Sequence, residues 1–128
     1  MLDTNMVSYL IRGNPEVVRH VVATPMNSLC ISVITHCEVL FGLAKRPDAK
    51  RLHLAVQEFL RRVDVLPLDS AVAQQYGSLR AAMERKGEIL APFDLLIATH
   101  ALSVGAVLVT NDMAFRQVNN LVIENWID

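Results

Sequence analysis

The sequence has few cysteine and aromatic residues. Its two cysteines, Cys30 and Cys37, lack C-x-x-C spacing, and its four histidines form no H-x-x-x-H or Cys/His cluster, so a zinc site is not expected. Free, buried thiols in a reducing cytoplasm are the better expectation. One histidine, His100, lies in an apolar stretch and is expected to be a core residue rather than a ligand. Aromatic residues make up 5% of the chain, too few for a platform that stacks the bases of single-stranded nucleic acid.

Long uninterrupted apolar runs are also missing. Proline, glycine and isolated acids interrupt each weakly charged stretch before it reaches the roughly 18 apolar residues of a membrane-spanning helix. No basic region with a small-residue cleavage site opens the sequence, so no secretory signal is expected. We therefore expect a cytoplasmic protein without a membrane partner. Its 128 residues suit a single domain, 1–128, and its 52% apolar content predicts helices that are buried on more than one face.

Four carboxylates occur where charge is otherwise absent. Asp3 is the only charged residue before Arg12, and Glu38 is the only one between Val21 and Ala44. Asp94 is alone between Ile89 and Asn111, and Asp112 closes that stretch. An ionised carboxylate buried without a partner costs several kcal/mol, so it normally neutralises, pairs or binds a metal. Since no Lys or Arg lies in these runs, the four acids predict one acidic pocket that binds a divalent cation.

Each acid also has an ordinary structural interpretation. Asp3 could cap a helix that starts near Met6, and Asp94, two residues after Pro92, could answer the dipole of a first helical turn. Glu38 could be an exposed residue on an amphipathic helix, and Asp112 could form a turn after a strand. Their joint occurrence in apolar surroundings favours the metal pocket over four independent explanations.

The net charge of -1 conceals an uneven distribution. Without the four candidate acids, nine acids remain against twelve bases, a balance of +3. The bases cluster at Lys45-Arg46, Lys50-Arg51, Arg61-Arg62 and between Arg80 and Lys86. An acidic cleft rimmed by cations suits a polyanionic substrate, although solvated helix faces with i,i+4 pairs would give the same clusters.

Periodicity and capping residues predict an alternation of helices and short strands. Helices are expected at about 6–12, 15–23, 33–45, 52–63, 70–86 and 92–104, and strands at 1–2, 29–32, 65–68, 106–110 and 121–123. Either Ser32 or Thr35 could cap the third of these helices. This alternation, with strands apolar on both faces, predicts an α/β fold with a short central parallel sheet covered by helices on both faces. Ligands of such sheets bind beyond the carboxyl ends of the strands. Asp3 and Asp112 follow strands at that edge, and Glu38 and Asp94 lie on helices that could point there.

The residues also carry a family resemblance. The motifs M-L-D-T-N at the start, S-x-x-T-x-x-E-x-x-x-G at 32–42, P-F-D-x-x-I-A-x-H-A at 92–101 and V-T-N-D at 109–112 occur in this order, before a closing E-N-W. Together they resemble a PIN domain of the VapC toxin type, over essentially the whole chain. The resemblance implies a PIN-like fold and a metal-dependent endoribonuclease whose acidic quartet is Asp3, Glu38, Asp94 and Asp112. It also implies Mg²⁺ or Mn²⁺ as cofactor, and supporting hydrogen bonds from Asn5 and Thr110.

The resemblance extends to partners. It implies a homodimer, a cognate VapB-type antitoxin and an RNA substrate, for which enteric members suggest a structured RNA such as initiator tRNA. An antitoxin tail is expected to place an Arg or Lys near the four acids, because a guanidinium binds carboxylates with parallel hydrogen bonds. The expected groove for its apolar segment lies on the early helices, unless these residues pack the core or a dimer interface: Val7, Leu10, Ile11, Leu40, Phe41 and Leu43.

Two departures from the family pattern carry expectations of their own. Members usually have a few more residues before L-D-T-N, so a short first strand and a poorly supported Asp3 are expected here. Some members use a later Glu, which Phe115-Arg116-Gln117 does not provide, so the fourth role falls on Asp112.

The expected chemistry follows from the charges. Clustered carboxylates raise one another's pKa, and Mg²⁺ ions bound by oxygen ligands would relieve this repulsion and activate water against a phosphodiester. We expect Asp3 and Asp94 to ligate the main ion, and Glu38 and Asp112 to complete the site or orient the water. A receiver-type phosphoacceptor domain fits less well, since it needs an acidic pair after the first strand and a late Lys. A catalytically silent PIN-like module that binds RNA or protein remains the alternative.

Overall fold

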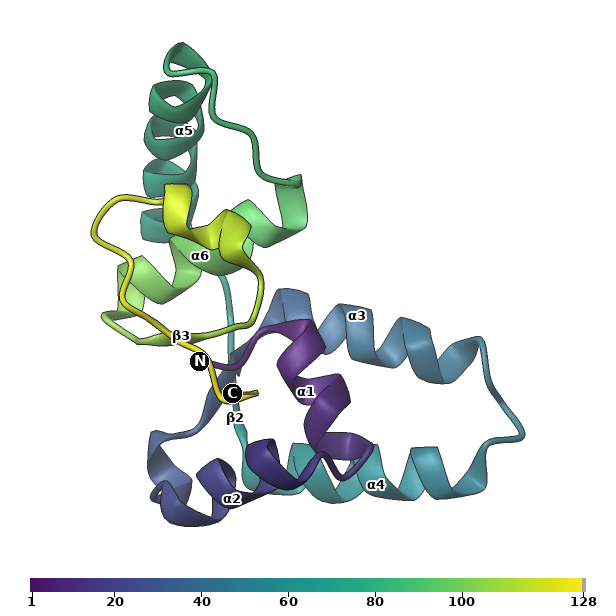
Figure 1. Cartoon of the computed structure of the whole chain (residues 1–128). Coiled ribbons are helices and arrows are strands. Elements are labelled where there is room, and N and C mark those ends of the chain that lie inside the picture. Colours follow the sequence, from purple (N-terminus) through teal and green to yellow (C-terminus); the bar gives the residue numbers. More distant parts are fainter. Residues whose placement is uncertain (128) are drawn as a thin grey trace.

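A short parallel sheet lies among six α-helices in the computed structural model, which describes residues 1–127 (Figure 1). The helices are α1 (Thr4–Ile11), α2 (Pro15–Ala23), α3 (Val33–Ala44), α4 (Lys50–Arg62), α5 (Ser70–Arg85) and α6 (Pro92–Val104). Two 3₁₀ helices are η1 (Met26–Ser28) and η2 (Met113–Gln117). The strands are β1 (Cys30–Ser32), β2 (Asp64–Leu66), β3 (Leu108–Val109) and β4 (Ile123–Glu124). No helix in this described part is long and apolar enough to cross a bilayer.

The sheet consists of two parallel strand pairs joined by the first residues of the chain. β1 pairs with β2, and β3 pairs with β4. Between them, the Leu2 N–H donates to the Cys30 carbonyl (3.0 Å), and the Val109 N–H donates to the Met1 carbonyl (2.8 Å). Leu2 forms only an isolated parallel bridge, with Val109. The expectation of a short first strand is therefore confirmed, and this bridge links the two pairs.

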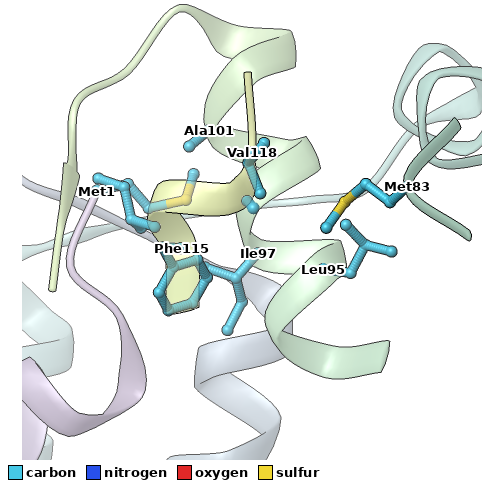
Figure 2. Close-up of a cluster of buried hydrophobic side chains, with 9 residues drawn as sticks. Met1, Met83, Leu95, Ile97, Ala101, Phe115 and Val118 are labelled. Atoms are coloured by element: carbon cyan, nitrogen blue, oxygen red, sulfur yellow. The ribbon is translucent and has the colours of Figure 1, made fainter. Parts of the chain in front are cut away.

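Side chains that alternate along the strands fill two hydrophobic clusters. Met1, Cys30, Leu66 and Leu108 contribute to a cluster with α5, α6 and η2, part of which is shown in Figure 2. Their neighbours contribute to a second cluster with α1, α2 and α4: Leu2, Ile31, Val65 and Val109. Because successive strand residues point to opposite faces, each cluster covers one face of the sheet. The predicted α/β fold with helices on both faces is confirmed.

Capping residues explain where most helices begin. Asp3, Asn14, Ser32 and Asp69 each accept a hydrogen bond from a backbone N–H of the helix that follows. Such caps satisfy donors that have no partner within the helix. Ser32, rather than the alternative Thr35, is therefore the cap of α3. Gly105 ends α6 with a φ of 68°, a left-handed conformation that glycine adopts without strain.

Four predicted strands differ from the observed ones in their bounds. The predicted strand 29–32 is Cys30–Ser32, 106–110 is only Leu108–Val109, 65–68 is Asp64–Leu66, and 121–123 is Ile123–Glu124. β2 ends before Pro67, which has no N–H for the ladder. β3 is bounded by its partner, because its register with β4 pairs only two residues. Apolar runs thus overestimated strand length, since flanking residues are buried without joining the ladder.

His100 is a core residue, as expected. It is fully buried on α6, and its Nδ1 lies 2.8 Å from the Ser32 hydroxyl oxygen. Among residues 1–127, its Nε2 has no hydrogen-bond partner. Burial lowers the pKa of His100, so the ring is neutral near pH 7 and joins α6 to the start of α3.

Candidate active site

The fold brings four acids from distant parts of the chain to the carboxyl end of the central strands. Asp3 follows the Leu2 bridge, and Asp112 follows β3 and caps η2. Asp94 lies in the first turn of α6, and Glu38 lies in the middle of α3. η2 packs on α6 through Phe115 and Val118 in the first cluster, so it brings Asp112 to the end of α6 that carries Asp94.

Asp3 is buried and firmly held. Its side chain is only 4% exposed, and its carboxylate accepts a 2.9 Å hydrogen bond from the Met6 N–H and another from the Thr110 side chain. Its own N–H donates to the Val109 carbonyl (3.1 Å). The expectation of a poorly supported Asp3 is therefore wrong, because Met6, Val109 and Thr110 each hold this residue with a hydrogen bond. Asp3 caps α1 as well, so its structural role and its place in the acidic site coincide.

Electrostatic coupling shows that the four acids are neighbours. Burial raises the pKa of Asp3, and the charges of Asp94 and Asp112 raise it further. Burial also raises the pKa of Asp94, to which Asp112 and then Glu38 add. All the charges that act on these two groups are carboxylates, so repulsion is not relieved by a neighbouring Lys or Arg. The structure therefore assembles one acidic site from the four acids singled out in the sequence.

Glu38 and Asp112 are each oriented by a hydroxyl-bearing or backbone partner. The Thr4 hydroxyl donates a 2.6 Å hydrogen bond to Glu38 Oε1. The Asp112 carboxylate accepts from the Ala114 N–H (2.9 Å), and the Asp112 N–H donates to Thr110 Oγ1 (3.0 Å). Asp112 thus caps η2, and its charge acts on Asp3 and Asp94. Thr110 contacts both Asp3 and Asp112, and so it fixes the relative position of two acids.

Two polar neighbours differ from the sequence-based expectation. Asn5 is exposed and lies beside the site in a groove, without a hydrogen bond to any of the four acids among the described residues. Thr4, which was not singled out, is the residue that holds Glu38. The sequence signal was present, since a hydroxyl follows Asp3 directly, but only the packing of α1 against α3 reveals its partner.

The donor set suits a hard divalent cation. Carboxylate oxygens are the ligands that Mg²⁺ prefers, and a cation would relieve the repulsion that raises the pKa values of Asp3 and Asp94. Within residues 1–127, however, no three His, Cys, Asp or Glu side chains converge closely enough to hold an ion. Asp3, Glu38 and Asp112 each point at a hydrogen-bond donor instead. Cation binding therefore requires these carboxylates to turn toward one another.

A groove leads away from the acids. α1 lies between α3 and α4 (Figure 1), and the three helices border a cavity of about 390 Å³. Thr4, Asn5 and Glu38 line one part of this cavity, and Arg12, Lys45 and Arg46 line another. The groove thus connects a negative site to a positive surface, which suits an extended polymer as the ligand.

Comparisons with known proteins place this geometry in a family. Residues 1–121 match the PIN domain family. The chain is 37% identical over 127 residues to a protein of Shigella flexneri named tRNA(fMet)-specific endonuclease VapC, covering 98% of this chain and 96% of that protein. It is 34% identical over 129 residues to Ribonuclease VapC2 of Rickettsia felis, covering 98% and 96%.

Solved structures agree with the sequence relatives. The crystal structure of VapBC2 from Rickettsia felis, bound to a promoter DNA fragment, superimposes with a TM-score of 0.91 at 34% identity, covering 98% of this chain and 97% of that chain. DNA-bound VapBC from Salmonella typhimurium gives 0.88 at 37% identity, covering 98% and 96%. With the acidic site at the same edge of the sheet that the family motifs predict, the chain belongs to the PIN domain family, among the VapC-type ribonucleases.

Proposed function

We propose that this protein is the toxin of a toxin–antitoxin pair, an endoribonuclease that hydrolyses phosphodiester bonds of RNA with the help of Mg²⁺ or Mn²⁺. The observation that carries the proposal is the coupling of Asp3, Glu38, Asp94 and Asp112 in one site without a cationic partner. The names of the VapC relatives support an RNA-cleaving hydrolase. The chemistry of the donors supports the metal.

In the proposed mechanism, Asp3 and Asp94 hold the cation, and Glu38 and Asp112 complete the site or orient the attacking water. When bound, a divalent cation supplies positive charge that polarises the phosphoryl group and eases deprotonation of water. Without a cation, the Thr4 hydroxyl holds Glu38, and Thr110 holds the Asp3 carboxylate and the Asp112 N–H, so the carboxylates would turn to the ion from defined positions. Because burial raises the pKa values of Asp3 and Asp94, protonation of these groups competes with cation binding at a higher pH than it would for an exposed aspartate.

The substrate class is proposed from the relatives. Two of them, from Shigella flexneri and Salmonella typhimurium, carry the name tRNA(fMet)-specific endonuclease at 37% identity. We therefore propose a structured RNA, with initiator tRNA as the first candidate. A basic groove beside the acids suits a folded polyanion, because phosphate contacts position RNA without reading bases.

A cognate VapB-type antitoxin is the proposed protein partner. Structural relatives that carry the VapBC name are toxin–antitoxin complexes. Ile11 and Leu43 line the groove that starts at Glu38, whereas Val7 is fully buried in the second cluster and is excluded from a docking surface. An apolar antitoxin segment in this groove would bring an Arg or Lys to the acids. A homodimer and a cytoplasmic location complete the proposal.

A cleavage assay tests the proposal. Purified protein is incubated with total tRNA in Mg²⁺, in Mn²⁺ and in EDTA, and products are resolved by denaturing electrophoresis. We expect discrete fragments with either metal and none in EDTA. Cleavage that persists undiminished in EDTA would exclude the metal-dependent mechanism. Expression of the chain without an antitoxin should also arrest bacterial growth, and Asp94→Asn should abolish the arrest.

A catalytically silent module that binds RNA or protein is the alternative function. It would bind tRNA in the same basic groove, but it would yield no fragments with any divalent cation. Binding without cleavage by a folded, metal-saturated sample would favour this alternative.

A further inference from the structure

Five cations gather around the turn between α3 and α4. Two of them end α3 or follow it, two begin α4, and one follows α1: Lys45, Arg46, Lys50, Arg51 and Arg12, which we call the basic turn. All five side chains are exposed. Four of them, with Asp48 as the one acid, line a cavity of about 520 Å³ at this end of the molecule.

The basic turn takes part in none of the ion pairs among residues 1–127. The ion pairs of the described residues involve Arg19, Arg61, Arg62 and Arg80, each bound to a Glu on its own helix. None involves a member of the basic turn in this part of the chain, although Lys45 lies over the Phe41 ring and Arg12 over the Tyr9 ring. Of the seven other Lys and Arg residues, four are thus paired locally, whereas the five of the basic turn lie together without an ion pair in this part of the chain.

Two of the cations occupy positions that the helix itself disfavours. Lys50 and Arg51 are the first residues of α4, where the helix dipole is positive, and the Ala49 cap provides no side-chain acceptor. Cations at this end destabilise a helix, whereas anions stabilise it. The Lys50 N–H already donates to the Asp48 carbonyl (3.0 Å), so a bound anion would gain from the side chains and from the remaining N–H groups of the first turn.

The backbone of the turn is fixed. His53 Nε2 lies 2.9 Å from the Arg46 carbonyl oxygen, and the Ala49 N–H donates to the same carbonyl (3.1 Å). The cations therefore extend from a rigid frame, which lowers the entropic cost of binding an extended ligand.

The basic turn and the acidic site lie along one groove. Arg12, Arg46, Ile11 and Leu52 line both the cavity at the basic turn and the groove that reaches Thr4 and Glu38. Along α1, eight residues separate Thr4 from Arg12, about 12 Å at 1.5 Å per residue. A stacked nucleic-acid strand advances about 3.4 Å per nucleotide, so this separation corresponds to roughly three to four nucleotides.

We propose that the basic turn is a subsite for the RNA backbone, which binds phosphates three to four nucleotides away from the scissile bond. This inference rests on the proposed ribonuclease function and adds the direction in which the RNA leaves the acids, along α1 and α3 toward α4. The subsite is expected to bind RNA independently of base sequence, since its Lys and Arg side chains bind the phosphates.

Binding of labelled RNA tests the subsite independently of cleavage. The variant pair Arg46→Gln with Arg51→Gln is compared with Arg61→Gln with Arg62→Gln, which removes two arginines that Glu58 already pairs. All proteins carry Asp94→Asn to prevent cleavage, and circular dichroism checks their folding. Fluorescence anisotropy then measures the Kd of oligouridylates of 3, 6, 9 and 12 nucleotides between 50 and 200 mM salt.

We expect the first pair to bind the longer oligonucleotides more weakly and to lose two counterion-releasing contacts. The slope of log K against log salt should become shallower by about 1.4. The ratio of the parent's binding constant to that of the variant pair should therefore fall about sevenfold from roughly 50 to 200 mM salt. The 3-nucleotide RNA, too short to reach the basic turn, should bind all the proteins equally. Unchanged slopes, or equal losses in the Arg61/Arg62 pair, would overturn the subsite.

The two proposals fail in different ways. If the parent protein, with its native Asp94, does not cleave RNA but the length-dependent binding is observed, the ribonuclease function is wrong and the subsite stands. If the parent cleaves RNA and the first variant pair binds every oligonucleotide as tightly as the parent, the ribonuclease function stands and the subsite is wrong.

Discussion

The acidic site and the basic turn lie along the same groove, but they hold their charges in opposite ways. At the acidic site, Asp3 is nearly inaccessible and is fixed by backbone and hydroxyl donors. At the basic turn, all the cations are exposed and lack ion pairs in the described chain. Buried like charges lower the stability of the fold, and a bound cation can remove this penalty. Exposed like charges cost the fold little and act mainly on a charged ligand that approaches the surface.

This difference separates chemistry from affinity. Carboxylates positioned within the fold can act only on an atom brought to them, and a small displacement disables them. Exposed cations on flexible stems tolerate movement and raise the local concentration of a polyanion. Variants at the acidic site should therefore change kcat, and variants at the basic turn should change KM and its salt dependence.

The largest expected effect is from Asp94→Asn. It removes a charge from the centre of the acidic site and keeps the shape of the side chain, so RNA cleavage should fall to background while RNA binding persists. The measurement is single-turnover cleavage of tRNA at saturating protein. Asp64→Asn, at an exposed position on β2, is the matched control and should retain the parental rate. Cleavage by the Asp94 variant at the parental rate would remove Asp94 from the mechanism.

Thr110→Val should have the next largest effect. It keeps the volume of a fully buried side chain but removes the hydroxyl that contacts Asp3 and the Asp112 N–H. Loss of such orienting contacts typically costs 10- to 100-fold in metal affinity or activity, so we expect about that loss in kcat. Titration of Mn²⁺ by calorimetry should show weaker binding. Thr99→Val, equally buried but bonded to the Leu95 carbonyl within α6, provides the control.

The pH dependence of stability sharpens the contrast between buried and exposed charge. Because the pKa values of Asp3 and Asp94 are raised on folding, the folded protein retains protons that the unfolded chain releases. In EDTA, this contribution to stability is full below the ordinary aspartate pKa of 3.8 and is lost as pH rises through the higher pKa values of the folded protein. Mg²⁺ should restore stability near neutral pH. Urea unfolding of the parent and Asp94→Asn between pH 4 and 8 measures the effect. As pH rises, the free energy of unfolding should fall less in the variant than in the parent.

The smallest expected effect is at the other end of the groove. Lys50→Glu places an acid in the first turn of α4, where the dipole favours it, and should stabilise the fold by about 0.3–1 kcal/mol. The same change should weaken RNA binding. Equilibrium urea unfolding measures the first effect, and fluorescence anisotropy measures the second. A variant that loses stability would show that Lys50 supports the fold rather than a ligand.

The sequence predicted the acidic site better than it predicted the strands. Charge isolation in apolar runs identified Asp3, Glu38, Asp94 and Asp112, because the penalty for burying a charge restricts where acids occur. Strand lengths were overestimated, since apolar residues such as Ala106 and Val107 are partly buried without entering the ladder. The spacing of apolar residues indicates which residues are buried, but only the register between strands shows which residues pair.

Contacts between distant residues account for what the sequence did not predict. The Thr4–Glu38 hydrogen bond depends on the packing of α1 against α3, and the support of Asp3 depends on Thr110 at the other end of the chain. Asn5, grouped with Thr110 by the family motif, is exposed in the groove instead. Side-chain partners across the fold follow from tertiary geometry, for which a single sequence offers no local signal.

The central position of Met1–Asp3 in the sheet has a consequence for synthesis of the protein. Two partners of Asp3, the Val109 carbonyl and the Thr110 side chain, lie near the end of the chain, so the acidic site cannot form until most of the chain has left the ribosome. Translation of about 100 residues takes about 5 to 20 s at ordinary rates. During that interval the nascent chain contains Asp3 without the other acids of the site. The acidic site is therefore completed only near the end of synthesis.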